Sequence, residues 1–163
     1  MQSQTLEERV GELLVRLGLT ISLAESCTGG LIGHRLTNVP GSSRYFMGGV
    51  VAYDNGVKER ILGVRRETLA EHGAVSAETA QEMAQRARRL FNTDLALSVT
   101  GIAGPSGATP EKPIGLTHVH LSARDAEWGE RHIWQGNREE NKARSAEAAL
   151  DLLRRYLERA LAP

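Results

Sequence analysis

The segment Ala24-Glu25-Ser26-Cys27-Thr28-Gly29-Gly30 joins an apolar, strand-like run at 19–23 to a helix-like run at 31–39. The first backbone N–H groups of a helix lack partners within it, and the helix dipole presents its positive end there, so such a turn accepts an anion readily. Two glycines also let a ligand approach the backbone closely. The turn carries two candidate nucleophiles, Ser26 and Cys27, although an ordinary N-cap followed by a flexible turn has a similar sequence. We expect a substrate to contact Cys27, Thr28, Gly29 and Gly30.

Outward from this turn, strands and helices alternate along the chain. Apolar residues recur at helical spacing from 6 to 17, and Asn137 with Glu140 forms a capping box for the last helix. We predict helices at 6–17, 31–39, 56–62, 67–72 (a turn or short helix), 77–91 and from 137 onward, and strands at 20–24, 45–53, 94–99, 114–122 and 127–135. Leu90 and Leu161 are expected on buried helix faces. This order predicts an α/β fold with a mixed, mainly parallel sheet covered by helices on both faces.

The composition predicts a single domain, residues 1–163, that binds a small molecule. With 163 residues, 40% of them hydrophobic, the chain is long enough for one core and short for two. Basic and acidic residues number 20 each, so no net charge indicates a nucleic-acid partner. A single cysteine excludes an internal disulfide, and neither a signal-peptide pattern nor a bilayer-length apolar run occurs. We expect a soluble, cytoplasmic protein with no membrane or nucleic-acid partner, and a homodimer, since small α/β enzymes often pair.

Candidate chemistry lies where loops follow strands, because ligands of α/β sheets bind beyond the carboxyl ends of strands. Three such segments carry hydroxyls or a lysine: 25–30, 53–58 and 100–113. The third is rich in glycine and proline and is expected to be a long ordered loop or a mobile lid.

A serine nucleophile needs a base, and a lysine serves when burial lowers its pKa. Lys58 is the only lysine in the first 107 residues, so it is the natural partner for Ser26, although a solvated lysine is the plainer interpretation. Tyr53 is either an ordinary strand residue or a proton relay. Cys27 competes as the nucleophile because a helix N-terminus lowers the pKa of a thiol, yet no histidine is placed to pair with it.

Cations near the start of the last helix indicate a binding role. Arg138 and Lys142 oppose the helix dipole there, and an anionic ligand group would make their placement favourable. We expect both to bind substrate, with Arg144 as the fallback and solvent exposure as the alternative. His118 and His120 share one strand face but have no third ligand at a supporting spacing, so no metal site is expected.

Five motifs in this order resemble the CinA C-terminal domain family over about residues 6–157. They are Ala24-Glu25-Ser26-Cys27-Thr28-Gly29-Gly30, Tyr53-Asp54-Asn55-Gly56-Val57-Lys58, Gly73-Ala74-Val75-Ser76, Thr100-Gly101-Ile102-Ala103-Gly104-Pro105 and Pro110-Glu111-Lys112-Pro113-Ile114-Gly115. Stand-alone members of that family are nicotinamide-nucleotide amidohydrolases. The resemblance implies a three-layer α/β/α sandwich that deamidates nicotinamide mononucleotide to nicotinate mononucleotide and ammonia, without a metal or a cofactor.

The resemblance also assigns roles to individual positions. The family's serine nucleophile, lysine, tyrosine and strand-end threonine fall on Ser26, Lys58, Tyr53 and Thr100. Gly136-Asn137-Arg138-Glu139 stands where the family has Gly-Asp-Arg-Glu, and Lys142 stands where an arginine is common.

In the expected reaction Ser26 attacks the carboxamide, Lys58 transfers the proton and Tyr53 assists. N–H groups at 27–30, or in the Thr100–Gly101 turn, would stabilise the oxyanion. Two other functions stay open: a nucleotide-binding regulatory module without turnover, and a Cys27-dependent amidase or transferase.

Overall fold

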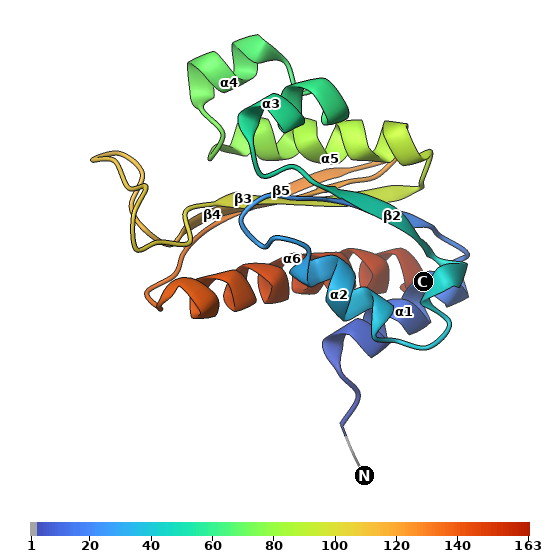
Figure 1. The fold of residues 1–163 in the computed structure, drawn as a ribbon. Coiled ribbons are helices and arrows are strands. Elements are labelled where there is room, and N and C mark those ends of the chain that lie inside the picture. Colours follow the sequence, from blue (N-terminus) through green and yellow to red (C-terminus); the bar gives the residue numbers. More distant parts are fainter. Residues whose placement is uncertain (1–2) are drawn as a thin grey trace.

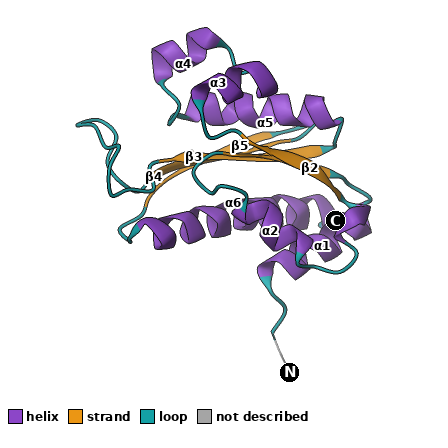
Figure 2. Ribbon diagram, viewed as in Figure 1, coloured by secondary structure: helices purple, strands orange, loops and turns teal. Residues whose placement is uncertain are grey.

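The computed structural model describes residues 3–163, which form a five-stranded sheet between two layers of helices (Figures 1 and 2). The strands are β1 (Ile21–Glu25), β2 (Phe46–Val51), β3 (Leu95–Gly101), β4 (Leu116–Ser122) and β5 (Glu127–Ile133). They lie in the order β2-β1-β3-β4-β5. β1 pairs in parallel with β2 and β3, whereas β4 is antiparallel to both of its neighbours, so β4 alone runs against the other strands. The predicted mixed, mainly parallel sheet is confirmed.

The helices cover both faces of this sheet (Figure 1). One layer holds α1 (Leu6–Leu17), α2 (Leu31–Thr37) and α6 (Arg138–Leu161), and the other holds α3 (Asn55–Val57), α4 (Arg66–His72) and α5 (Ala77–Phe91). A π-helical turn, η2 (Lys58–Leu62), continues α3, and a short 3-10 turn, η1 (Ser42–Arg44), precedes β2. The three-layer α/β/α arrangement is therefore confirmed. Among residues 3–163, no helix combines the length and the apolar character needed to cross a bilayer.

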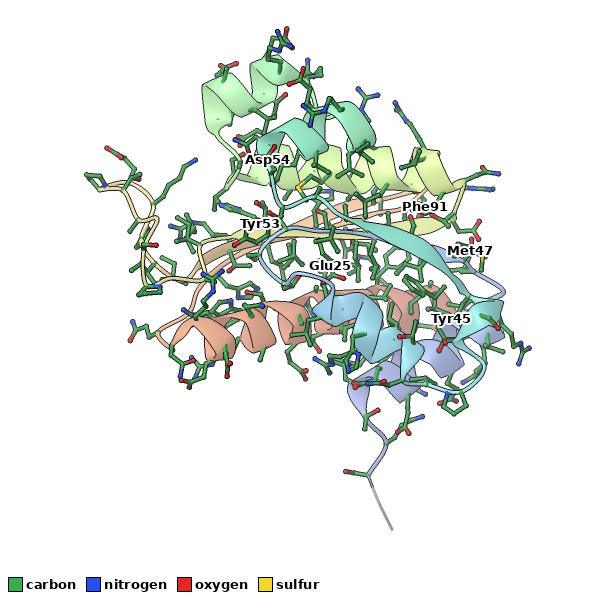
Figure 3. All side chains as sticks on the ribbon, in the orientation of Figure 1. Glu25, Tyr45, Met47, Tyr53, Asp54 and Phe91 are labelled. Carbon is green, nitrogen blue, oxygen red and sulfur yellow. The ribbon has the colours of Figure 1, made fainter. Side chains whose placement is uncertain are left out.

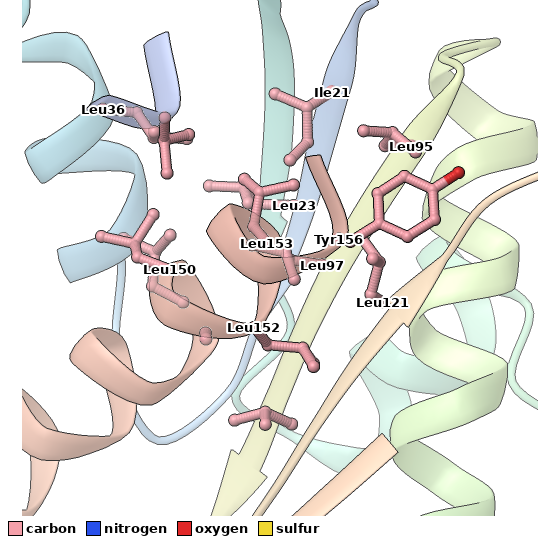
Figure 4. Packing of buried hydrophobic residues seen from close by; sticks show 14 of the residues in the cluster. Ile21, Leu23, Leu36, Leu95, Leu97, Leu121, Leu150, Leu152, Leu153 and Tyr156 are labelled. Carbon is pink, nitrogen blue, oxygen red and sulfur yellow. The ribbon is translucent and has the colours of Figure 1, made fainter. Parts of the chain in front are cut away.

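The two faces of the sheet bury different apolar side chains. Large aliphatic residues of β1 and β3, namely Ile21, Leu23, Leu95 and Leu97, pack against the helices on one face of the sheet (Figure 4). Those helices contribute Leu36 from α2 and Leu150 and Leu153 from α6. Smaller side chains, including Ala24, Ala52 and Ala96, line much of the face under α5, and Ala87 of α5 packs with them. Full burial of one large aliphatic side chain contributes roughly 1.5–3 kcal/mol, so the first cluster supplies most of the hydrophobic stabilisation. This core fixes β1 and β3 side by side at the sheet centre.

Several elements are shorter than the sequence predicts. The helix expected at 31–39 ends at Thr37, and the strand expected at 45–53 covers only Phe46–Val51, because its sole partner β1 has five residues. The strands expected at 114–122 and 127–135 cover Leu116–Ser122 and Glu127–Ile133.

Two side chains expected inside the core lie at helix ends instead. Leu90 is 54% exposed, because Phe91 takes the place over the edge strand, where Gly48 leaves room for its ring. Leu161 is only partly buried, in the last turn of α6.

Candidate active site

Ser26 and Lys58 meet at the carboxyl ends of the central strands. Ser26 directly follows β1, and its N–H group donates to the carbonyl of Val99 in β3 (2.9 Å). Lys58 begins η2, and its Nζ lies 3.0 Å from Oγ of Ser26. Both side chains are buried, with relative exposures of 7% for Ser26 and 1% for Lys58. The two residues that the sequence pairs are therefore in direct contact, shielded from bulk water.

The surroundings of Lys58 suit a neutral amine. Besides Ser26, its Nζ lies within hydrogen-bond distance of two backbone carbonyls, those of Ala52 (2.8 Å) and Tyr53 (3.1 Å). The carbonyls can only accept, so a neutral amine with two bonds to them has its lone pair left for the Ser26 hydroxyl. Burial lowers the pKa of Lys58 below its ordinary value of 10.5, because the charged form loses hydration. The lysine is thus placed to remove the serine proton.

A cavity of about 160 Å³ opens beside these two side chains. Its lining comes from the turn after β1, the β2–η2 connection with the start of η2, the α4–α5 connection, the end of β3 with the loop after it, and the start of α6. The lining residues are Ser26, Cys27, Tyr53, Asn55, Lys58, Ala74, Val75, Thr100, Gly101, Ala103 and Arg138. The Thr100 hydroxyl donates to the carbonyl of Ala74 (2.8 Å) and so fixes one wall. Pockets for drug-sized ligands usually measure about 300–1,000 Å³, so this cavity encloses only part of a nucleotide.

Glu25 is a buried residue of this region that the sequence analysis missed. Its carboxylate accepts hydrogen bonds from the Thr28 hydroxyl (2.6 Å) and from the N–H groups of Ile32 (2.9 Å) and Gly33 (3.0 Å). Figure 3 labels Glu25 between the sheet and α2. The N–H groups of Ile32 and Gly33 at the start of α2 are therefore bound to a carboxylate of the protein itself and are not open to a substrate anion. A glutamate at a strand end shortly before a helix was the available signal.

The turn after Ser26 still presents backbone donors. Within residues 3–163, the N–H groups of Cys27, Thr28 and Gly30 donate no hydrogen bond to another residue. Cys27 directly follows Ser26 and also lines the cavity, so its N–H group lies next to Ser26. These groups are the candidates for holding an oxyanion at Ser26.

Cys27 has an environment opposite to the one expected. Burial raises the pKa of its thiol to about 12, and the negative charge of Glu25 acts in the same direction. The prediction that a helix N-terminus lowers this pKa is wrong, because burial of the thiol raises it and the Glu25 carboxylate adds to the rise. At neutral pH Cys27 is a protonated, weakly nucleophilic thiol.

Arg138 joins two parts of the cavity rim. Its Nη1 donates to the carbonyl of Gly104 (2.7 Å) and its Nη2 donates to the hydroxyl of Tyr53 (3.0 Å). The Tyr53 side chain is 60% exposed and points away from the core in Figure 3. Within residues 3–163, the hydrogen bond between Tyr53 and Lys58 is accepted by the backbone carbonyl of Tyr53, and its hydroxyl forms none with Lys58.

The other two cations of α6 lie in different places. Nζ of Lys142 approaches Gly29, 3.8 Å from where a Cβ would stand, and forms no ion pair within residues 3–163. Arg144 lines a separate hollow with Trp134 and Asp151, away from Ser26. Of the predicted cations, Arg138 and Lys142 therefore lie near the site, and Arg144 does not.

The long loop after β3 is tied down by residues that carried no sequence signal. Nδ2 of the buried Asn141 donates to the carbonyl of Ala103 (3.0 Å), and its Oδ1 accepts from the N–H group of Gly136 (2.9 Å). Nζ of Lys112 donates to the carbonyl of His72 (2.6 Å). The loop, which projects from the sheet in Figure 1, is held at both of its ends.

The histidines of β4 have a partner that the sequence analysis did not foresee. The hairpin brings Glu127 of β5 to 2.7 Å from Nε2 of His120, and burial lowers the pKa of that imidazole despite the carboxylate. His118 lines the same hollow as His120. Throughout residues 3–163, no three His, Cys, Asp or Glu side chains gather as a metal site would require.

Known proteins share both the sequence and the fold. The family model of the CinA C-terminal domain matches residues 3–157. A CinA-like protein of Chloroherpeton thalassium is 54% identical over 157 residues, which cover 93% of this chain and 37% of that protein. The chain thus spans well under half the length of such curated relatives. The crystal structure of competence/damage inducible protein CihA from Agrobacterium tumefaciens is 39% identical, with a TM-score of 0.89 and coverage of 97% of this chain and 99% of that one. Competence damage-inducible protein A (ComA) from Klebsiella pneumoniae is 33% identical, with a TM-score of 0.91 and coverage of 94% and 95%. This chain belongs to the CinA C-terminal domain family.

Proposed function

We propose that the chain is a serine-lysine amidohydrolase that converts nicotinamide mononucleotide to nicotinate mononucleotide and ammonia. One observation carries the proposal: a buried lysine amine lies 3.0 Å from a buried serine hydroxyl, on the wall of a cavity. A binding module has no need of a nucleophile paired with a base whose pKa is lowered by burial. The family resemblance supplies the substrate.

In the proposed reaction, the neutral Lys58 takes the proton of Ser26 as Oγ attacks the carboxamide carbon. The N–H groups of Cys27 and Thr28 stabilise the negative oxygen of the tetrahedral intermediate. Lys58 then gives its proton to the leaving nitrogen, and the C–N bond breaks to release ammonia and leave an acyl-serine. Water attacks this ester while Lys58 accepts a proton from it, and the proton returns to Oγ as the acid leaves.

The remainder of the nucleotide would extend over the cavity mouth. The cavity of about 160 Å³ fits the carboxamide end, so the phosphate lies outside it. Both donor arms of Arg138 are engaged with Gly104 and Tyr53, which favours Lys142, beside Gly29, as the group that binds the phosphate. Tyr53 then acts through its carbonyl on Lys58 and through Arg138 on the rim.

Ammonia release from nicotinamide mononucleotide tests the proposal in three proteins. We expect turnover by the wild type, turnover near the wild-type rate by Cys27→Ala and no turnover by Ser26→Ala. Cys27→Ala is the matched control, since it changes the neighbouring nucleophile in the same buried turn. An inactive Cys27→Ala beside an active Ser26→Ala would reverse the assignment. Tight nucleotide binding by a wild type that releases no ammonia would favour the regulatory module instead.

A further inference from the structure

Asn55 lies beside the proposed catalytic pair for a geometric reason. It is the first residue of α3 and precedes Lys58 by three positions along a continuous helical segment. Residues three apart on a helix share a face, so both side chains line the same cavity. Asn55 is exposed, whereas Lys58 is buried beneath it, so Asn55 stands at the mouth and Lys58 at the floor.

Asn55 is also the polar side chain of this cavity that is free to bind a ligand. The hydroxyl of Thr100, the amine of Lys58 and the guanidinium of Arg138 all contact other protein groups. Neither Nδ2 nor Oδ1 of Asn55 forms a hydrogen bond to any residue from 3 to 163. The preceding residue, Asp54, already caps the helix by accepting from the N–H group of Gly56 (2.8 Å). Helix capping therefore does not explain the asparagine.

We propose that Asn55 is a specificity-determining residue that recognises the primary carboxamide of the substrate, an inference that rests on the proposed function. Once the substrate carbonyl oxygen faces the N–H groups of Cys27 and Thr28, the NH₂ group remains to be bound. Oδ1 of Asn55 accepts from that NH₂ group.

The same contact separates the substrate from its product. The product carboxylate has acceptors only, so Oδ1 of Asn55 finds no donor on it and repels its charge while the amide keeps the orientation that binds the substrate. Esters and N-substituted amides are disfavoured in the same way, because they lack one or both N–H donors. Asn55 thus favours the amide before the reaction and release of the acid after it.

Binding measurements without turnover test this role. In the Ser26→Ala background, calorimetry gives the dissociation constants of nicotinamide mononucleotide and nicotinate mononucleotide, with and without Asn55→Ala. We expect the amide to bind roughly tenfold more weakly after Asn55→Ala, the size of one lost hydrogen bond, while the acid binds as well as before or better. Asn55→Asp should weaken both, and the acid more strongly. Asn38→Ala is the matched control, as an exposed asparagine at the end of α2 that does not line the cavity.

The outcomes separate the two proposals. Equal weakening of amide and acid by Asn55→Ala, or no change in either, would overturn the role of Asn55 and leave the amidohydrolase proposal standing. If the Ser26→Ala protein binds neither nucleotide and the wild type releases no ammonia, the proposed function fails, and the role of Asn55 fails with it.

Discussion

At the scale of single residues, the choice of lysine at position 58 is informative. Of the 20 arginine and lysine residues in the chain, only those at positions 58, 112 and 142 are lysines. Arginine stays protonated in proteins, whereas a buried lysine can lose its proton near neutral pH. The buried position beside Ser26 therefore holds the basic residue that can act as a base.

Lys58→Met should lower ammonia release at neutral pH by at least about a hundredfold, because the thioether has similar length but accepts no proton. Burial lowers the pKa of Lys58 from 10.5, so the wild-type rate should rise with pH as the neutral amine forms, at a pH below that value. A pH–rate profile from about pH 6 to 10 measures this. Lys112→Met, which alters a lysine outside the cavity, should keep the wild-type ionisation. A Lys58→Met profile with the same ionisation would remove Lys58 from the mechanism.

Cys27 should resist alkylation in the folded protein. With its pKa raised to about 12 from 9.0, the thiolate population near neutral pH falls by roughly a thousandfold relative to the unfolded chain. Mass spectrometry after treatment with iodoacetamide at pH 8, in buffer and in urea, measures the contrast. Similar rates under both conditions would show that the thiol is open and ionisable, and would return Cys27 to the list of nucleophiles.

At the scale of secondary structure elements, local sequence patterns predicted most of the architecture. The capping box at Asn137 and Glu140 located the start of α6, and the apolar runs located β1 and β3, because these signals depend on neighbours in the chain. The pairing of Ser26 with Lys58 was also predictable, since both follow strands whose carboxyl ends meet at one edge.

Features that depend on distant contacts were not predictable in this way. Asn141 binds the carbonyl of Ala103, 38 residues away, and nothing in the local sequence indicates that bond. The local sequence predicts a lowered pKa for the thiol of Cys27, but burial raises that pKa. Burial depends on the packing of distant segments, so the local sequence does not indicate it. The role of Glu25 was missed because a carboxylate at a strand end usually faces water.

The Glu25 carboxylate should stabilise α2, because it accepts hydrogen bonds from N–H groups in the first turn of that helix. Glu25→Gln keeps the shape but turns an NH₂ group toward N–H donors, so one buried donor loses its acceptor, at a cost of about 1–3 kcal/mol of unfolding free energy. Urea denaturation of the variant measures this. Glu8→Gln is the matched control, since Glu8 caps α1 at an exposed site and its loss should cost less. Equal losses in the two variants would mean that the Glu25 carboxylate does not hold the start of α2.

At the scale of the whole molecule, the site exists only where distant parts of the chain converge. Ser26 follows β1, Lys58 begins η2, one wall comes from the α4–α5 connection, and the rim is closed by α6 near the other end of the sequence. Arg138 of α6 holds this assembly by bonding at once to the loop after β3 and to Tyr53 after β2. Arg138 thus contributes to the site by holding these two segments in place relative to each other.

If Arg138 holds the rim together and Lys142 binds the phosphate, their alanine variants should behave differently. Lys142→Ala should reduce kcat/KM for nicotinamide mononucleotide by about 10- to 100-fold, the size of one charge-assisted hydrogen bond. The same variant should leave kcat/KM for nicotinamide riboside, which lacks the phosphate, nearly unchanged. Arg138→Ala should reduce kcat/KM for both substrates by a similar factor, because it removes the hydrogen bonds to Gly104 and Tyr53 and no phosphate contact. Arg144→Ala, on the same helix but at a separate hollow, should change neither.

The ratio of kcat/KM for the two substrates in each variant decides between these roles. A loss confined to the phosphorylated substrate in Arg138→Ala, with Lys142→Ala unchanged, would mean that Arg138 leaves Gly104 and Tyr53 to bind the phosphate. The rim would then rearrange each time the nucleotide binds. The hydrogen bonds from Arg138 to Gly104 and Tyr53 would exist only in the unliganded protein. If instead the selective loss follows Lys142, the rim holds its arrangement through binding, and the phosphate is bound by the one lysine that stands beside Gly29 with no partner between residues 3 and 163.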